Sequence, residues 1–208
     1  GAILAHIGVN IFNEYQDFKT GLDKKTQRTP FSGGSGTLQQ NPELAKTALG
    51  IALVVSAITA AIGIYFTIKQ GPWLLPIGIL GIAFLYIYTI WMVYNPVLSL
   101  ISPGLGFGTL MVLGTQYALT GEITLISFAA SLIPFFLVSN LLLLNQFPDV
   151  EADKSIGKRT YPIVIGRRKS SHIFNAFQVL TYITIISCVI LKVFPVWSLL
   201  GLLTLPFA

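Results

Sequence analysis

The sequence predicts an all-α fold, a polytopic bundle of transmembrane helices. Only 10% of its 208 residues are charged, whereas about 25% of a soluble domain is charged. Hydrophobic residues make up 53% of the chain, and eight acidic and thirteen basic residues are too few to cover a soluble globule of this length. The single cysteine, Cys188, has no second cysteine with which to form a disulfide, which excludes a disulfide scaffold.

The charge-free intervals predict the individual spans, because a transmembrane helix needs about 20 apolar residues. The interval 70–121 is long enough for two spans, and we expect proline and glycine to divide it at 94–96 and 102–104. In chain order, the expected spans are a partial one over 1–18, five over about 47–68, 73–93, 104–120, 123–144 and 171–192, and a seventh that begins near 196. Both ends of the sequence fall within apolar stretches, so we expect a chain truncated at both ends.

Two polar segments, about 19–46 and 145–170, connect these spans. They contain eleven of the thirteen basic residues: Lys19, Lys24, Lys25, Arg28, Lys46, Lys154, Lys158, Arg159, Arg167, Arg168 and Lys169. The positive-inside rule places both segments in the cytoplasm, and the four spans between them return the chain to the same side. We therefore expect a multi-pass protein of the plasma membrane with two cytoplasmic loops and no affinity for nucleic acid.

Acidic and amide side chains gather at the ends of two predicted helices, beside the two polar segments. The first cluster has the helical spacing i, i+3, i+4, i+7 and consists of Asn10, Asn13, Glu14 and Asp17. Gly21 permits a turn that would bring Asp23 towards this cluster. The second cluster has the spacing i, i+4, i+8 on one helical face and consists of Asn145, Asp149 and Asp153.

Carboxylates that lie close together at a membrane boundary repel one another, and a bound divalent cation removes this cost. Oxygen ligands without a nearby cysteine or histidine pair favour Mg²⁺ over zinc, and Mg²⁺ commonly completes its coordination with substrate phosphates. The basic residues that could bind the same phosphates are Lys24, Arg28, Lys158 and Arg159. The residues thus predict a cytoplasm-facing, Mg²⁺-dependent diphosphate site at the mouth of an apolar bundle, and solvated loop ends of mixed charge are the alternative.

At these residues the sequence resembles the UbiA superfamily of intramembrane aromatic prenyltransferases. The first signature of that family, Asn-Asp-x-x-Asp with a further Asp, corresponds to Asn13-Glu14-Tyr15-Gln16-Asp17 with Asp23. The second, Asp-x-x-x-Asp with a preceding Asn, corresponds to Asn145, Asp149 and Asp153. The spacing from Phe18 to Asp23 and the stretches 33–38 and 106–121 resemble the 1,4-dihydroxy-2-naphthoate (menaquinone-type) branch.

The resemblance implies one transmembrane prenyltransferase domain over 1–208, which would hold about seven of about nine family spans around a central cavity. It implies Mg²⁺-dependent transfer of an isoprenyl group from a polyprenyl diphosphate to an aromatic quinone precursor, such as 1,4-dihydroxy-2-naphthoate, within the lipid bilayer. It assigns Asp17 and Asp149 as catalytic residues. The implied metal ligands are Asn13, Asp17 and Asp23 in one group and Asp149 and Asp153 in the other, with Glu14 and Asn145 as second-rank ligands.

Two positions depart from the family pattern: Glu14 replaces an aspartate, and residues 93–106 contain no basic residue that could bind diphosphate. Asn10, Tyr88 and Tyr94 are candidates for the cavity wall. His6, one turn before Asn10, is expected to be a packed, hydrogen-bonded histidine, with a place in the cavity as the alternative. A transporter or ion-binding membrane protein, and a prenyltransferase with a non-quinone acceptor, remain the competing interpretations.

Overall fold

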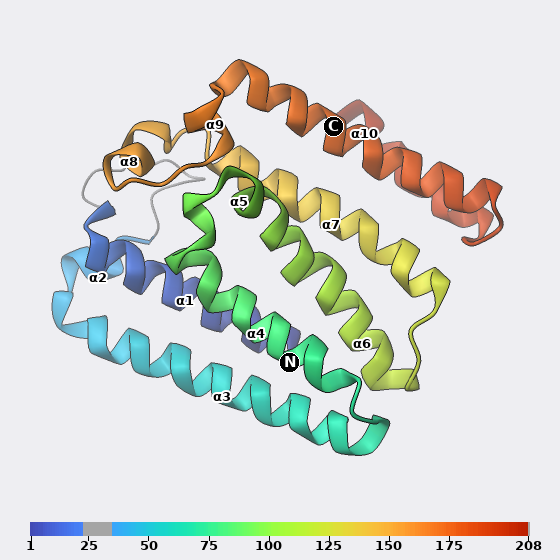
Figure 1. Cartoon of the computed structure of the whole chain (residues 1–208), viewed down its shortest axis with the longest axis horizontal. Helices are drawn as coiled ribbons and strands as arrows, with labels where there is room; N and C mark the ends of the chain where they lie inside the picture. The colour runs from blue at the N-terminus through green and yellow to red at the C-terminus, as the bar shows by residue number, and fades with distance from the viewer. Residues whose placement is uncertain (23–34, 208) are drawn as a thin grey trace.

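The chain folds into long helices that lie side by side, as the computed structural model shows for residues 1–22 and 35–207 (Figure 1). The uninterrupted long helices are α1 (Ala2–Thr20), α3 (Ala45–Gln70), α4 (Leu74–Ile90), α7 (Leu125–Asn145) and α10 (Arg167–Ile190). A further long helix consists of α5 (Pro96–Pro103), η4 (Gly104–Leu110) and α6 (Met111–Thr120), and the 3₁₀ segment η5 (Val196–Phe207) ends the described chain. No strand occurs in the described ranges, so the all-α prediction is confirmed.

Four helices of the described chain are long and apolar enough to cross a membrane. They cover Pro42–Gln70, Pro96–Thr120, Leu125–Asn145 and Arg167–Ile190. Two shorter apolar helices, Leu74–Ile90 and Val196–Pro206, lie at the third and last predicted spans, and α1 covers the predicted partial span over 1–18. Every predicted span therefore corresponds to a helix, and the chain is a multi-pass membrane protein.

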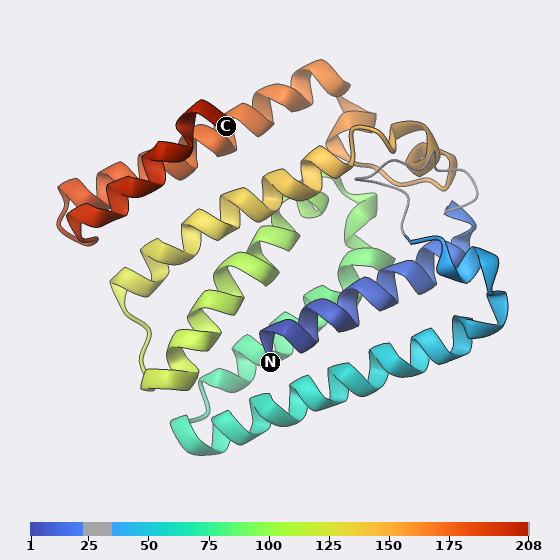
Figure 2. The ribbon, with the colours of Figure 1, turned by 180° about the vertical axis from the view of Figure 1, so that it is seen from behind.

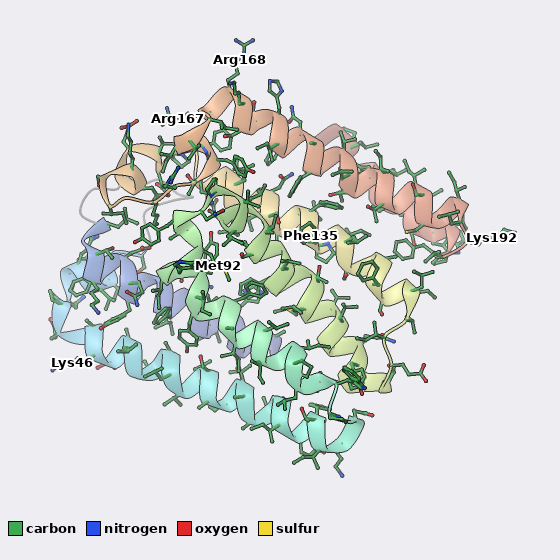
Figure 3. All side chains as sticks on the ribbon, viewed as in Figure 1. Lys46, Met92, Phe135, Arg167, Arg168 and Lys192 are labelled. Carbon is green, nitrogen blue, oxygen red and sulfur yellow. The ribbon has the colours of Figure 1, made fainter. Side chains whose placement is uncertain are left out.

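The short helices lie together at one end of the bundle (Figure 1). They are α2 (Thr37–Gln40), η2 (Pro42–Leu44), α8 (Val150–Ser155) and α9 (Tyr161–Val164). The basic residues Lys46, Arg167 and Arg168 lie at the same end, whereas Lys192 lies at the opposite end (Figure 3). The described parts of the two polar segments thus share one end of the bundle, as the even number of intervening spans requires.

The prediction that the fourth span begins at residue 104 is wrong, because one continuous helical segment runs from Pro96 to Thr120. The chain breaks earlier, at η3 (Met92–Tyr94), and restarts where the Asn95 side chain accepts hydrogen bonds from the backbone N–H groups of Val97 and Leu98. Pro103 does not end the helix, because the helical backbone continues beyond it into the π-helical segment η4.

Two glycines let this composite helix approach α7 closely. A Cβ atom on Gly104 would lie 2.3 Å from the backbone oxygen of Phe135, and one on Gly108 would lie 2.5 Å from the backbone nitrogen of Phe135. Real Cβ atoms do not occur at such distances, so only glycine permits this contact. In a membrane, where lipid is as apolar as leucine, close contact between small residues is a main source of helix association. Figure 2 shows the other face of the bundle, where α1 packs on α3 and α4.

Candidate active site

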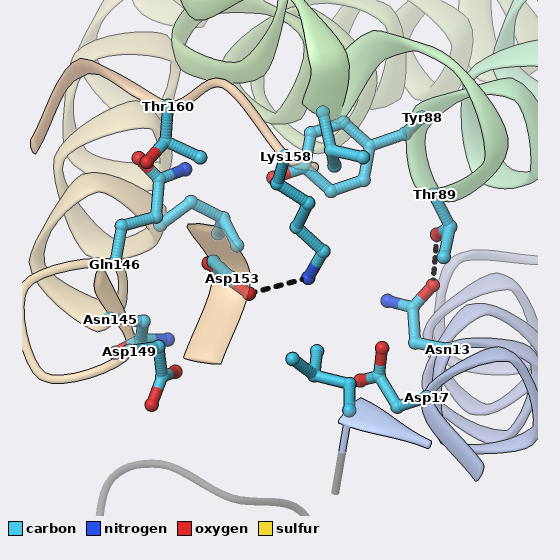
Figure 4. A pocket seen from close by; sticks show the side chains of 13 residues that line it. Asn13, Asp17, Tyr88, Thr89, Asn145, Gln146, Asp149, Asp153, Lys158 and Thr160 are labelled. Carbon is cyan, nitrogen blue, oxygen red and sulfur yellow. Dashed lines mark hydrogen bonds and ion pairs between the residues drawn. The ribbon is translucent and has the colours of Figure 1, made fainter. Parts of the chain in front are cut away.

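A polar pocket of about 160 Å³ lies at the end of the bundle that carries α8 and α2 (Figure 4). Side chains from α1, α4, α7 and the segment after α7 surround it. They are Asn13, Asp17, Leu22, Tyr88, Thr89, Val93, Leu142, Asn145, Gln146, Asp149, Asp153, Lys158 and Thr160. Two acidic clusters that are far apart in the sequence therefore face one pocket.

The α1 side of the pocket carries Asn13 and Asp17, one helical turn apart. The hydroxyl of Thr89 on α4 donates a hydrogen bond to Oδ1 of Asn13, which fixes the amide (Figure 4). Glu14, the next residue along the chain, does not line the pocket, and its carboxylate accepts a hydrogen bond from Ser35 instead. The helix ends at Gly21, whose φ of 72° gives the left-handed turn predicted before Asp23.

The opposite side of the pocket is built from three segments, so the prediction that Asn145, Asp149 and Asp153 share one helical face is wrong. Helix α7 ends at Asn145, a turn follows, and Asp149 immediately precedes the separate helix α8, which carries Asp153. Pro148 explains the break, because proline disfavours the helical conformation in the residue before it. The three side chains nevertheless line the same pocket.

Asp153 is buried, at 5% exposed, and pairs with Lys158 at 2.9 Å between Oδ1 and Nζ. The backbone supports this pair, because the N–H group of Lys158 donates to the carbonyl of Asp153 at 3.1 Å. Gly157, with φ of 83°, makes the turn between the two residues. The chain thus places an ammonium group inside a pocket that otherwise carries carboxylates and amides.

A neutral network at the base of the pocket had no counterpart in the sequence-based prediction. The amide of Gln146, 8% exposed, donates to the hydroxyl of the fully buried Ser99 at 2.9 Å. The Tyr88 side chain interacts with both residues. Thr160, 2% exposed, also lines the pocket, and its hydroxyl has no hydrogen-bond partner within the described ranges. The segment 93–106, which has no basic residue, thus contributes the buried hydroxyl of Ser99 to this network.

A larger cavity of about 790 Å³ adjoins the polar pocket and extends into the bundle. Its wall comes from α1, α3, α4, the composite helix and α7, and is mainly aliphatic and aromatic. Four residues line both spaces: Asn13, Tyr88, Leu142 and Asn145. The polar pocket and the apolar cavity therefore share part of their lining. A molecule with a polar head and an apolar body could occupy both.

The remaining candidate residues differ in whether they line the polar pocket, the large cavity or neither. Asn10 lines the large cavity, as expected, whereas Tyr94 and Arg159 line neither space. His6 also lines the large cavity and stacks on Phe107, with ring centroids 4.2 Å apart. The expected hydrogen bond of His6 does not occur within the described ranges. The predicted residues that lie outside the described ranges are Asp23, Lys24 and Arg28.

The donor set of the polar pocket suits a hard cation. Its carboxylate and amide oxygens come from Asp17, Asp149, Asp153, Asn13 and Asn145, and oxygen is the ligand that Mg²⁺ prefers. Within residues 1–22 and 35–207, no three or more side chains of histidine, cysteine, aspartate or glutamate lie close enough together to bind one ion.

The fold and the site define a class of protein: a multi-pass helical membrane protein whose polar end pocket adjoins an apolar cavity. The chain belongs to the UbiA prenyltransferase family, whose family model matches residues 1–208. The resemblance found in the two acidic motifs is thereby confirmed.

The chain is similar to three curated proteins named 1,4-dihydroxy-2-naphthoate octaprenyltransferase. It is 31% identical to the protein of Bacillus subtilis (strain 168) over 203 residues, which cover 96% of this chain and 64% of that protein. It is 26% identical to the Mycobacterium leprae protein and 25% identical to the Mycobacterium tuberculosis protein, covering 100% of this chain and 68% and 69% of those proteins. The chain thus spans about two thirds of the length of these relatives. No solved structure matches it significantly.

Proposed function

We propose that this protein transfers an isoprenyl group from a polyprenyl diphosphate to an aromatic acceptor inside the membrane, in a reaction that depends on Mg²⁺. The observation that carries the proposal is the shared wall between the carboxylate-lined pocket and the apolar cavity. A lipid diphosphate has a head that suits the first space and a chain that suits the second. The names of the three relatives favour 1,4-dihydroxy-2-naphthoate as the acceptor.

The residues of the polar pocket divide into metal ligands and phosphate ligands. Asn13 and Asp17 would hold one metal position and Asp149 and Asp153 the other, with Asn145 beside them and Asp23 completing the first group. Lys158 is the pocket's basic residue within the described ranges, and its ammonium group would bind phosphate oxygens. Lys24 and Arg28 are further candidates for the same task, whereas Arg159 lines neither the pocket nor the cavity. Mg²⁺, when bound, supplies positive charge that stabilises the diphosphate as it departs.

The reaction itself breaks the bond between C1 of the isoprenyl chain and the diphosphate oxygen, and the electron pair leaves with the diphosphate. An electron-rich ring carbon of the acceptor supplies the pair for the new bond to C1. That carbon then loses the group it carried, a proton or a carboxylate as CO₂, and the electron pair of the broken bond returns to the ring. The apolar cavity excludes water, which would otherwise capture the allylic cation. Tyr88 lines both the polar pocket and the apolar cavity, so it lies beside the place where the reacting carbon would be. Its aromatic face would stabilise positive charge there.

The two polar segments face the cytoplasm in this proposal, so that a water-soluble head group reaches the pocket from that side of the plasma membrane. The basic residues Lys46, Arg167 and Arg168 at the same end support this orientation. Carboxylates at one end of the bundle, rather than on broken helices at its centre, favour a transferase over a transporter.

The test is to reconstitute the full-length protein in liposomes with Mg²⁺, a labelled isoprenyl diphosphate and a panel of aromatic acceptors. We expect label in 1,4-dihydroxy-2-naphthoate, and we expect Asp17→Ala and Asp149→Ala each to abolish it. Full activity in either variant would remove the metal assignment. Release of diphosphate without a labelled acceptor would reject transferase activity, and cation flux without diphosphate release would favour the transporter.

A further inference from the structure

The ion pair between Asp153 and Lys158 joins two side chains that have different proposed partners. The carboxylate would bind metal, and the ammonium group would bind phosphate. In the structure they bind each other, at 2.9 Å between Oδ1 and Nζ, with 7% of the Asp153 side chain and 16% of the Lys158 side chain exposed. Each residue must therefore release the other before it can bind its proposed partner.

The backbone holds Lys158 in this position from both sides. Its N–H group donates to the carbonyl of Asp153 at 3.1 Å, and the turn at Gly157 between them has a φ of 83°. On the other side, the N–H group of Arg159 donates to the carbonyl of Val93 at 3.0 Å. The ammonium group can therefore move only as far as its own flexible stem permits, and it remains in or beside the pocket that Lys158 and Asp153 line.

Charge decides what can separate Lys158 from Asp153. A free divalent cation at Asp153 would take the place of the ammonium group, and the two positive charges would repel each other in a small, partly buried pocket. Lys158 would also lose its partner while it remained shielded from water, and an unpaired buried charge is strongly unfavourable. A metal that is bound to diphosphate avoids both penalties, because phosphate oxygens accept charge-assisted hydrogen bonds from lysine.

We propose that Lys158 is an internal counter-ion of Asp153, so that the polar pocket binds a metal–diphosphate complex in preference to the free metal ion. Lys158 exchanges the carboxylate for phosphate oxygens, and Asp153 then becomes available as a metal ligand. Metal and diphosphate thus each raise the affinity of the pocket for the other, as thermodynamic linkage requires. This inference rests on the proposed function, since it fixes the form in which the diphosphate head group enters the pocket.

The test measures binding to the full-length protein in lipid nanodiscs, with Mn²⁺ as a paramagnetic substitute for Mg²⁺ and labelled pyrophosphate as the anion. Without pyrophosphate, Lys158→Met should bind Mn²⁺ at least about tenfold more tightly than the unsubstituted protein. With Mn²⁺ in excess, the same variant should bind pyrophosphate about tenfold more weakly. The opposite signs distinguish the roles of Lys158. A lysine that binds only phosphate predicts the second change alone, and a purely structural lysine predicts that both affinities fall.

Three further variants separate the ion pair from general effects of charge and folding. Lys154→Met removes the same charge from an exposed residue of α8 outside the pocket, so it should change the Mn²⁺ affinity about twofold or less. In an Asp153→Asn background the lysine has no carboxylate partner, so Lys158→Met should then raise the Mn²⁺ affinity less than about threefold. Should Lys158→Met fail to fold, Lys158→Gln, whose amide can still donate to Asp153, replaces it with the same expected signs.

The outcomes for the counter-ion and for the proposed function are distinguishable. An unchanged Mn²⁺ affinity in Lys158→Met would overturn the counter-ion, and so would an equal gain in the Asp153→Asn background, because net charge would then explain it. A protein that transfers isoprenyl groups but gives either result would disprove the counter-ion alone. A protein that shows the expected shifts but releases no diphosphate from an isoprenyl diphosphate would disprove the transferase and retain the counter-ion.

Discussion

Replacing Gly108 by alanine should separate the composite helix from α7. The new Cβ would lie 2.5 Å from the backbone nitrogen of Phe135, 2.6 Å from its Cα and 2.8 Å from the carbonyl carbon of Pro134. Optimal contacts between carbon atoms are about 3.5–4.0 Å long, so the two helices must move apart by about 1 Å. All three opposing atoms belong to the backbone, and no rotation of a side chain can relieve the contact.

Two opposing terms give the size of the effect. Overpacking costs up to about 3 kcal/mol, and alanine gains back about 1 kcal/mol through its higher helix propensity. The net loss is therefore about 2 kcal/mol for Gly108→Ala. Gly106→Ala is the matched control, because its Cβ would meet only the Cβ of Phe84 at 3.6 Å, an ordinary contact. It should stabilise the helix by up to about 1 kcal/mol.

The assay is reversible unfolding of the purified full-length protein in mixed micelles by increasing fractions of sodium dodecyl sulfate. Tryptophan fluorescence follows the transition. We expect a lower midpoint for Gly108→Ala and an unchanged or higher midpoint for Gly106→Ala. If both variants unfold at the same midpoint, the close contact between the composite helix and α7 does not contribute as argued.

Three further predictions concern the polar pocket. Lys158→Met should raise the KM for isoprenyl diphosphate about tenfold or more, because it removes a charge-assisted bond to phosphate, whereas Arg159→Met, outside the pocket, should change it little. Removing divalent metal with EDTA should abolish transfer, and adding Mg²⁺ should restore it; activity that survives chelation would exclude the metal site. Glu14→Gln should retain most activity, because Glu14 bonds to Ser35 outside the pocket, and a loss as large as that of Asp17→Ala would make Glu14 a metal ligand.

The fold could be predicted from the sequence because charge is so scarce. Each long charge-free interval contains one helix, or two in the case of 70–121, and the basic residues marked the end that carries the loops. The error at residue 104 arose because proline usually breaks helices. Here the helix continues past Pro103 into the π-helical segment that starts at Gly104, and side-chain capping by Asn95 places the real break earlier.

The candidate site was predictable only in its charged part. The spacing of Asp17 and Asp149 with their amide neighbours indicated two clusters, and the structure brings both to one pocket. The buried neutral residues Gln146, Ser99 and Thr160 gave no signal, because such side chains are common in helices that have no binding site. Gln146 had one available clue, its position directly after Asn145, on the turn that separates the two acidic segments.

The π-helical segment η4 has a consequence for how this protein can evolve. Each residue of an α-helix turns the chain by about 100°, so the wider turn in Gly104–Leu110 sets the rotation of α6 relative to α5. Deleting one residue here would restore regular winding and leave Met111 and Gly114 facing the cavity that they line, because the π-helical segment turns the chain less per residue. A deletion in the α-helical turns of α5 or α6 would instead rotate every side chain beyond it by about 100°.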